Sequence, residues 1–537
     1  MFVAQRDHAY AEQNDLLLGY RLLSTVTVYP THMASTILTS TIVGLDASLV
    51  QVEADISQGL GAFTIVGLPD TAVQEARERV KGAMRHAGLT FPRTRVTINL
   101  APADLKKAGA GFDLPIATAV LTACGEIDVC DPNTRLLVGE LALDGHLRGV
   151  PGVLSTALLA ARIGIGELIV PLCNVDEATL VPGLIVRGAD TLQDVMDHIR
   201  GTAVLAAIPP RDIVIPDGVS GIPDMNAVRG QEQAKRALEI AAAGGHNILL
   251  QGPPGSGKTL LARSFPGILP RMTISEILEA TRIHSVAGLL PRNGYVSERP
   301  FRAPHSSASA VALVGGGSIP KPGEVSLAHR GVLFLDEFPE FPRNALENLR
   351  QPLEDGSVTV SRAHGTLTFP ARFLLVAAMN PCPCGYATDP ERQCTCAAIQ
   401  IQRYKKRLSG PLLDRIDLSM EVPKVPTQKL TDLTPGESSV ELRKRVQAAR
   451  DRQTQRYREL HLVTNAELSS DLVRTLVRPR PDAQEFLQKA IEQFHLSARA
   501  YFRVLKVSRT IADLAASDAI ELAHVAEALQ YRQISEA

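Results

Sequence analysis

The stretch GPPGSGKT, residues 252–259, decides the fold expected for the central part of this chain. It fits the pattern G-x-x-x-x-G-K-S/T, in which a strand-to-helix turn forms a cradle of backbone N–H groups for phosphates. The apolar run HNILLQ precedes it and TLLARSF follows it, as a strand before the turn and a helix after it require. The sequence therefore predicts an α/β unit with a phosphate-binding loop.

Each residue of this P-loop has an expected role. Glycines allow the backbone to approach phosphates, Lys258 can neutralise the β- and γ-phosphates, and the Thr259 hydroxyl can hold magnesium. The cofactors predicted from the pattern are ATP and Mg²⁺. The residues expected to bind the nucleotide are Gly252, Pro253, Pro254, Gly255, Ser256, Gly257, Lys258 and Thr259.

Two further apolar runs end in polar side chains that suit ATP hydrolysis. GVLFLDEF, residues 331–338, ends in two acids, of which Asp336 can hold magnesium and Glu337 can orient the attacking water. RFLLVAAMN ends at Asn380, whose side chain can reach the γ-phosphate or that water. We expect a P-loop core with a parallel sheet.

Two arginines downstream are candidates for the same reaction. SGPLLDRIDL, residues 409–418, contains Arg415, which suits an arginine finger donated to a neighbouring subunit. SARAY places Arg499 at the start of a helix near the C-terminus. Either arginine alone also fits a surface ion pair, and the order of the motifs favours the catalytic interpretation.

Four of the seven cysteines follow Asn380 with the spacing C-x-C-x9-C-x-C, namely Cys382, Cys384, Cys394 and Cys396. Two close pairs of thiolates joined by a loop can form a tetrahedral zinc site, although the usual spacing within a pair is wider. Free or redox-active thiols are the alternative. A metal at this position would brace the loop after Asn380, so its role would be structural.

Length and composition describe an ordinary globular protein. The chain has 537 residues, 45% of them hydrophobic and 21% charged, and a formal net charge of -1. This length suggests about three or four domains. No apolar run approaches the ~18 to 20 residues that span a bilayer, and the N-terminal stretch lacks the pattern of a signal peptide. We therefore expect no membrane partner and a cytoplasmic location.

The chain divides by pattern into five regions. Strand-like and helix-like runs alternate from Met33, where we expect the folded protein to begin, and a proline-rich stretch separates them from the P-loop unit. The expected divisions are an N-terminal extension at 1–32, an α/β domain at 33–205, a linker at 206–228, the P-loop unit at 229–430 and a helical region at 431–537.

A β-hairpin is expected from the alternation in EDGSVTVSRAHGTLTFPARF, residues 354–373, with Arg362 and His364 near its tip. A basic tip could follow a phosphate backbone. An ordinary surface hairpin fits the pattern equally well.

The order of these motifs resembles the magnesium-chelatase-like AAA+ ATPases, and most closely the ComM/YifB competence proteins. The resemblance rests on GPPGSGKT, FRAPHSSASAVALVGGG, PKPGEVSLAHRGVLFLDEFPEF, LRQPLEDG, AAMNPCPCG and SGPLLDRIDL. It implies an AAA+ core with a C-terminal helical lid. It also implies that Asn380 is sensor 1, Arg415 the finger acting in trans and Arg499 the sensor-2 arginine, in a homohexameric ring.

The region before the linker resembles a different enzyme. GELALDGHLRGVPGVLSTALLAARIGI, residues 139–165, is similar to the proteolytic domain of Lon, an S5-type α+β fold. Lon proteases use a serine and a lysine, and the resemblance puts Gly111 and Ser155 at those two positions. Neither residue can supply that chemistry, so we expect a docking or ring-supporting domain without peptidase activity.

The family resemblance implies an ATP-driven motor that acts on DNA. The implied activity is that of a helicase or branch-migration factor in the recombination of incoming DNA during natural transformation, with single-stranded or branched DNA and recombination proteins as partners. The alternative is a chaperone-like ATPase that remodels a protein partner, like the motor subunit of magnesium chelatase.

Overall fold

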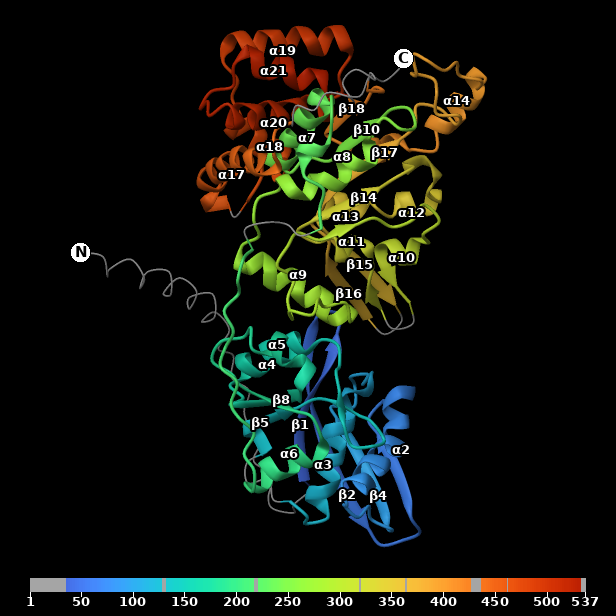
Figure 1. Cartoon of the computed structure of the whole chain (residues 1–537), viewed down its shortest axis with the longest axis vertical. Coiled ribbons are helices and arrows are strands. Elements are labelled where there is room, and N and C mark those ends of the chain that lie inside the picture. Colours follow the sequence, from blue (N-terminus) through green and yellow to red (C-terminus); the bar gives the residue numbers. More distant parts are fainter. Residues whose placement is uncertain are drawn as a thin grey trace, which may run out of the picture.

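The computed structural model describes residues 35–127, 132–216, 221–317, 320–362, 365–425, 436–460 and 462–532. The expected N-terminal extension lies outside these ranges. The molecule is elongated, with the first sheet at one end and the C-terminal helices at the other (Figure 1). None of the helices described is long and apolar enough to cross a membrane.

The first sheet has seven strands in the order β3-β4-β2-β1-β5-β8-β9. Strand β2 is antiparallel to β1 and β4, and the other neighbours are parallel. The strands are β1 (Ser35–Val43), β2 (Asp46–Ser57), β3 (Ala62–Val66), β4 (Arg95–Ala101), β5 (Arg135–Leu137), β8 (Glu167–Pro171) and β9 (Ile185–Ala189). A separate short pair consists of β6 (Glu140–Leu141) and β7 (Leu147–Arg148).

Helices cover both faces of this sheet because successive side chains of a strand point to opposite sides. Val50, Val52 and Ala54 of β2 are buried in a core with one group of helices, and Leu38 and Leu136 are buried in a core with the other. The first group is α2 (Thr71–His86), α3 (Asp113–Ala123) and α6 (Leu192–Arg200). The second is α4 (Val153–Ile163) and α5 (Val175–Ala178).

The second sheet is entirely parallel, with the order β11-β14-β17-β10-β18. Its inner strands consist almost wholly of buried apolar residues, as expected where helices cover both faces. This confirms the mixed α/β fold with a parallel sheet around the P-loop. The strands are β10 (Ile248–Gln251), β11 (Phe301–Arg302), β14 (Val332–Leu335), β17 (Leu374–Met379) and β18 (Leu418–Glu421).

Helices and short pairs complete this part of the chain. The longer helices are α7 (Glu232–Gly244), α8 (Lys258–Ser264), α9 (Ile274–Ala287) and α14 (Ala398–Lys405). The shorter ones are α10 (Ala310–Val314), α11 (Glu324–Leu327), α12 (Arg343–Glu347), α13 (Arg350–Asp355) and α15 (Gly410–Leu413). Strands β12 (Gly315–Gly316) and β13 (Lys321–Pro322) form a two-stranded pair.

The expected hairpin is confirmed. Strand β15 (Ser357–Arg362) pairs with β16 (Gly365–Pro370) in antiparallel register, with Arg362 opposite Gly365. The side chain of Arg362 and all of His364 lie outside the described part of the chain. Phe369 is fully buried in a small core with Leu45 of the first sheet's β1–β2 turn, so one end of the hairpin packs against that domain.

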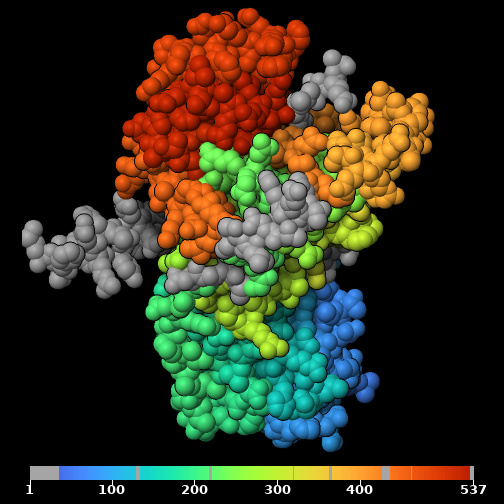
Figure 2. All heavy atoms as spheres, turned by 45° about the horizontal axis from the view of Figure 1, so that its top comes forward, coloured from blue at the N-terminus to red at the C-terminus, as the bar shows by residue number. Residues whose placement is uncertain are grey.

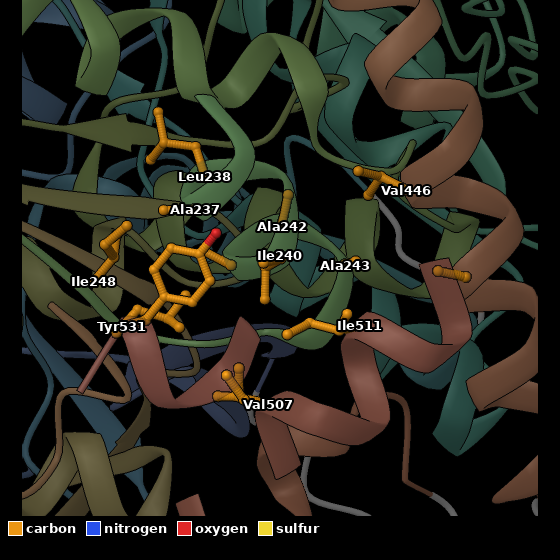
Figure 3. Packing of buried hydrophobic residues seen from close by; sticks show 14 of the residues in the cluster. Ala237, Leu238, Ile240, Ala242, Ala243, Ile248, Val446, Val507, Ile511 and Tyr531 are labelled. Atoms are coloured by element: carbon orange, nitrogen blue, oxygen red, sulfur yellow. The ribbon is translucent and has the colours of Figure 1, made fainter. Parts of the chain in front are cut away.

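The residues after 436 are mostly helical and share one core with the second sheet. Figure 3 shows Ile240 of α7 and Ile248 of β10 beside Val507 and Ile511 from the C-terminal helices. The helices are α17 (Ser439–Arg456), α18 (Ser470–Leu476), α19 (Pro481–Phe494), α20 (Ala498–Leu514) and α21 (Leu522–Gln530). Helix α7 is buried between the sheet on one side and α17 and α20 on the other. Moving α17 and α20 away from the sheet would therefore expose the apolar side chains of α7.

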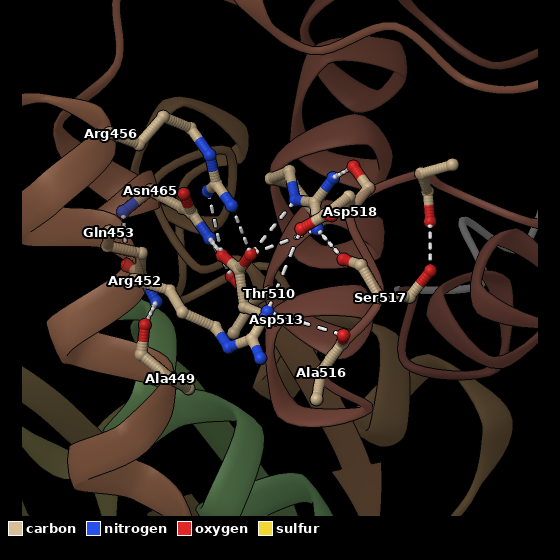
Figure 4. A network of polar contacts seen from close by, with 12 residues as sticks. Ala449, Arg452, Gln453, Arg456, Asn465, Thr510, Asp513, Ala516, Ser517 and Asp518 are labelled. Carbon is tan, nitrogen blue, oxygen red and sulfur yellow. Dashed lines mark hydrogen bonds and ion pairs between the residues drawn. The ribbon is translucent and has the colours of Figure 1, made fainter.

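A buried carboxylate joins three of the C-terminal segments. Asp513 of α20 accepts hydrogen bonds from Arg456 of α17 at 2.6 and 3.0 Å, from Arg509 at 3.1 Å and from Asn465 at 2.9 Å (Figure 4). Its side chain is fully buried. A buried charge is tolerated only when it is paired and hydrogen-bonded in this way.

Helix α9 connects the two sheets. Its residues Ile277 and Ala280 are buried in the core that α4 forms with the first sheet. Arg282 donates to the Leu45 carbonyl at 3.0 Å and pairs with Asp46. The helix therefore packs against the first domain while belonging in sequence to the P-loop unit.

Candidate nucleotide-binding site

The predicted site lies at the carboxyl edge of the second sheet. Strands β10, β17 and β14 are parallel neighbours that end at Gln251, Met379 and Leu335. The residue after β17 is Asn380, so it lies between the P-loop after β10 and the acidic pair after β14. Open parallel sheets bind their ligands at this edge.

Glycines give the P-loop its path. Gly255 and Gly257 have φ angles of +76° and +90°, a region that residues with a side chain seldom adopt. A Cβ atom on Gly252 would lie 2.1 Å from the Val422 carbonyl oxygen, so the start of the loop passes close to the chain after β18. Helix α8 then begins at Lys258.

Lys258 points back into this loop. Its Nζ atom donates to the carbonyl oxygens of Gly252 at 2.7 Å and Pro253 at 2.8 Å, and lies 3.4 Å from the Asn380 Oδ1 atom. Burial lowers the pKa of the Lys258 ammonium below its usual value, and the charge of Asp336 opposes this shift. The lysine is therefore a partly desolvated cation held by backbone dipoles.

The two residues expected to hold magnesium are in contact. Thr259 Oγ1 donates to Asp336 Oδ2 at 2.9 Å, and Asp336 Oδ1 accepts from the backbone N–H of Glu337 at 2.9 Å. Glu337 is exposed and has a φ angle of +51°, which is uncommon for a residue with a side chain. Hard oxygen donors of this kind are the ligands that Mg²⁺ prefers.

Arg415 does not join this group within one chain. Its guanidinium pairs with Glu354 and donates to the Pro411 carbonyl at 2.6 Å. It lines a hollow of about 600 Å³ together with residues of α10, α12, α13 and β15, and no P-loop residue lines that hollow. Its Nε atom is buried and has no hydrogen-bond partner in the described part of the chain.

Arg499 lies on the same side of the molecule as Arg415. Its Nη1 atom is 3.4 Å from Asp414 Oδ2, and its side chain is 67% exposed. The hydrogen bond and charge of Arg415, and more weakly the charge of Arg499, lower the pKa of the Glu354 carboxyl. The structure therefore places the two predicted arginines near each other, at acidic side chains outside the P-loop.

The four predicted cysteines form one cluster. Cys382 Sγ lies 3.3 Å from Cys384 Sγ and 3.6 Å from Cys394 Sγ, and Cys384 and Cys394 are 3.5 Å apart. With Cys396 included, all four sulfur atoms lie within 4.8 Å of one another. Backbone N–H groups of Tyr386 and Thr395 lower the pKa of the Cys384 thiol to about 5.

The two positions that the resemblance to Lon assigns to its catalytic dyad make other contacts in this structure. Ser155 Oγ is buried, donates to the Leu45 carbonyl at 2.6 Å and accepts from Arg282 Nε at 3.2 Å. A Cβ atom on Gly111 would lie 3.3 Å from Val138, so that position is enclosed by apolar side chains. Ser155 thus contributes to the contact with α9.

Sequence reasoning missed three residues at or near the site. Glu354 pairs with Arg415 although the two are far apart in sequence, and Asp414 pairs with Arg499. Gly385 packs against Pro254 of the P-loop. The available signal was that Glu354, Asp414 and Gly385 all lie inside motifs that had already been singled out.

Comparison with known protein families agrees with a P-loop fold around a parallel sheet. Residues 224–430 match the family model for magnesium chelatase, subunit ChlI, and residues 436–532 match the one for the C-terminal part of that subunit. Residues 52–174 match the model for subunit ChlI of Mg-chelatase. This class consists of AAA+ ATPases, which implies ATPase activity with ATP and Mg²⁺ as cofactors.

Individual relatives define the family more narrowly. The chain is 46% identical to the YifB protein of Escherichia coli over 93% of its own length and 97% of that protein. It is 47% identical to the competence protein ComM of Haemophilus influenzae over 91% of this chain and 95% of that protein. A 67 kDa magnesium-chelatase subunit of Chlorobaculum parvum is 28% identical over 28% of this chain and 22% of that subunit. The chain belongs to the YifB/ComM family of magnesium-chelatase-like proteins.

Proposed function

We propose that this protein is an ATP-hydrolysing, hexameric AAA+ motor that acts on DNA and promotes branch migration when incoming DNA is recombined during natural transformation. The observation that carries the ATPase part is the convergence of Lys258, the Thr259–Asp336 pair and Asn380 at the edge of one parallel sheet. The DNA part rests on the similarity to the competence protein ComM.

The chain's own residues divide the work of hydrolysis. Lys258 would exchange its two backbone carbonyl partners for phosphate oxygens, and the backbone N–H groups of residues 255–259 would bind the remaining charge. Thr259 and Asp336 would hold Mg²⁺, which when bound would neutralise charge on the phosphates. Glu337 would accept a proton from the attacking water, and Asn380 would hold that water or the γ-phosphate.

Assembly would supply the missing cation. Arg415 lines a hollow that no P-loop residue lines, so it would serve the nucleotide of the next subunit around a ring, and Arg499 would act as the sensor-2 arginine. The hairpin β15–β16 would face the DNA in the central channel. The helices after residue 436 would form the lid beside the nucleotide.

The first domain would support the ring and would not cleave peptides. On the proposed Lon-like fold, Gly111 would take the position of the catalytic serine and Ser155 that of the lysine. Ser155 already contacts Arg282. Residues 33–205 would thus form a docking domain, joined through 206–228 to the ATPase unit at 229–430 and the lid at 431–537.

A second candidate is a chaperone-like ATPase that remodels a protein partner. The match to a magnesium-chelatase subunit supports it. The similarity to ComM extends over nearly the whole chain and therefore favours the DNA motor.

A branch-migration assay tests the proposal. Purified protein, ATP and Mg²⁺ are incubated with a fluorescently labelled four-way DNA junction and, separately, with a three-stranded recombination intermediate. We expect ATP-dependent strand exchange that the Glu337→Gln variant lacks. ATP hydrolysis without any movement of strands would contradict the DNA motor and favour the protein remodeller.

A further inference from the structure

The segment between β17 and α14 has little to hold its shape. Residues 381–397 contain no helix or strand, and only Pro381, Cys382 and Gly385 among them are buried. Around α14 the chain forms a protrusion at the side of the molecule (Figures 1 and 2). A long irregular segment with so few buried side chains needs another source of order.

The four cysteines fit the geometry of a tetrahedral metal site. With Zn–S bonds of about 2.3 Å, the sulfur atoms of such a site lie roughly 3.8 Å apart. The sulfur pairs here range from 3.3 Å upward, and all lie within 4.8 Å. They are free thiols rather than disulfides.

The chemistry of the cluster selects the metal. An all-thiolate set of four favours zinc over magnesium or calcium, which prefer oxygen. Backbone N–H groups point at the sulfurs, from Cys384 to Cys396 Sγ and from Cys396 to Cys394 Sγ, each at 3.4 Å. Hydrogen bonds of this kind stabilise the thiolates that bind a metal.

The cluster touches the nucleotide site through one glycine. Gly385 follows Cys384 directly and has a φ angle of +87°. A Cβ atom on it would lie 2.7 Å from the Pro254 side chain and 3.8 Å from Asn380 Cγ. The turn closed by the cysteines therefore rests on both the P-loop and the residue expected to sense the γ-phosphate.

We propose that Cys382, Cys384, Cys394 and Cys396 bind one structural Zn²⁺, and that this zinc clamps the turn at Gly385 against Pro254 and Asn380. Without the metal the turn would lose its order, and the P-loop would lose the packing of Gly385 against Pro254. The effect on nucleotide binding rests on the proposed ATPase function, whereas the metal site itself does not.

Metal content is the first measurement. The full chain is purified without chelators under a reducing agent, and its metals are quantified by mass spectrometry. We expect one zinc per chain, released when the thiols are modified with a mercurial. The double variant Cys394→Ser/Cys396→Ser should lose the zinc, while Cys173→Ser, at an exposed cysteine outside the cluster, should retain it. A zinc-free wild-type chain would overturn the metal site.

Binding of a fluorescent ATP analogue tests the clamp. The double variant should bind it about tenfold more weakly or worse, because a displaced loop misplaces every phosphate donor. Gly385→Ala should keep its zinc yet show a similar loss, since the added carbon collides with Pro254. The second variant separates the clamp from a general folding defect, which circular dichroism also monitors.

Two outcomes would contradict different parts of the account. Unchanged nucleotide affinity in both variants would overturn the clamp. A wild-type chain that contains zinc but binds no nucleotide would instead contradict the ATPase function and leave the metal site standing.

Discussion

At the residue scale, Lys258 is the positive charge that the P-loop offers to a bound phosphate. Its ammonium group is held by the carbonyl oxygens of Gly252 and Pro253, and burial lowers its pKa. A desolvated cation gains more from a phosphate than an exposed one would. The same site presents Glu337 at the edge of the sheet, exposed and in an uncommon backbone conformation.

The variant Glu337→Gln should bind ATP normally and hydrolyse it more slowly by roughly 10²- to 10⁴-fold, as expected for loss of a general base. The phosphate cradle is untouched by this change. Equilibrium binding of an ATP analogue and steady-state phosphate release separate the two effects. The control is Glu340→Gln, which removes a nearby exposed carboxylate that pairs with Arg407. Normal turnover by Glu337→Gln would remove this residue from the mechanism.

At the scale of elements, α20 connects the C-terminal helices to the sheet. Thr510 accepts or donates a hydrogen bond with His246 at 2.8 Å, and His246 contacts Asp417 just before β18 at 3.1 Å. Asp513, one turn further along α20, pairs with Arg456 and Arg509. Helix α20 is therefore fixed to β18 and α17 by buried polar contacts as well as by its apolar face.

Replacing Asp513 by alanine should destabilise this part of the protein by about 3 kcal/mol or more, because two arginines are left without their buried counter-charge. Urea unfolding followed by circular dichroism measures the change. Asp518→Ala is the matched control, since that side chain is fully exposed and its ion pair with Arg452 is long. Equal stability of the two variants would show that the buried pairs contribute little.

Local sequence patterns predicted the parallel strands and the hairpin. They did not predict contacts between residues that are distant in the sequence. The parallel strands around the P-loop and the β15–β16 hairpin follow from apolar runs and alternation within short windows. The Arg415–Glu354 pair, the contact of Arg499 with Asp414 and the packing of Gly385 on Pro254 join residues that are far apart in sequence. Such partners depend on how the elements pack, which no local pattern encodes.

At the scale of the whole molecule, the residues predicted to act in hydrolysis lie on different surfaces. The P-loop and the acidic pair lie at one edge of the second sheet, whereas Arg415 lines a separate hollow and Arg499 lies beside Asp414. Two different surfaces of one chain can meet head to tail, and such contacts close into rings when the rotation between subunits allows it. Each complete site would then need two chains.

Complementation between inactive variants tests this division. Arg415→Ala should bind ATP yet lose hydrolysis by about 10³-fold or more, as expected for an arginine finger. Mixed with Glu337→Gln, it should regain activity, because some interfaces would combine an intact Glu337 with an intact Arg415 from the neighbour. The mixture is compared with each variant alone at equal total protein. If it stays inactive while the chains co-assemble, the finger does not act in trans.

The most direct test of the central claim is steady-state ATP hydrolysis by the purified protein, alone and with single-stranded, duplex and four-way branched DNA at fixed salt. A DNA motor should hydrolyse ATP faster with DNA, and the stimulation should vanish in Glu337→Gln. An assembled, ATP-binding ring whose hydrolysis ignores all three kinds of DNA would contradict the claim.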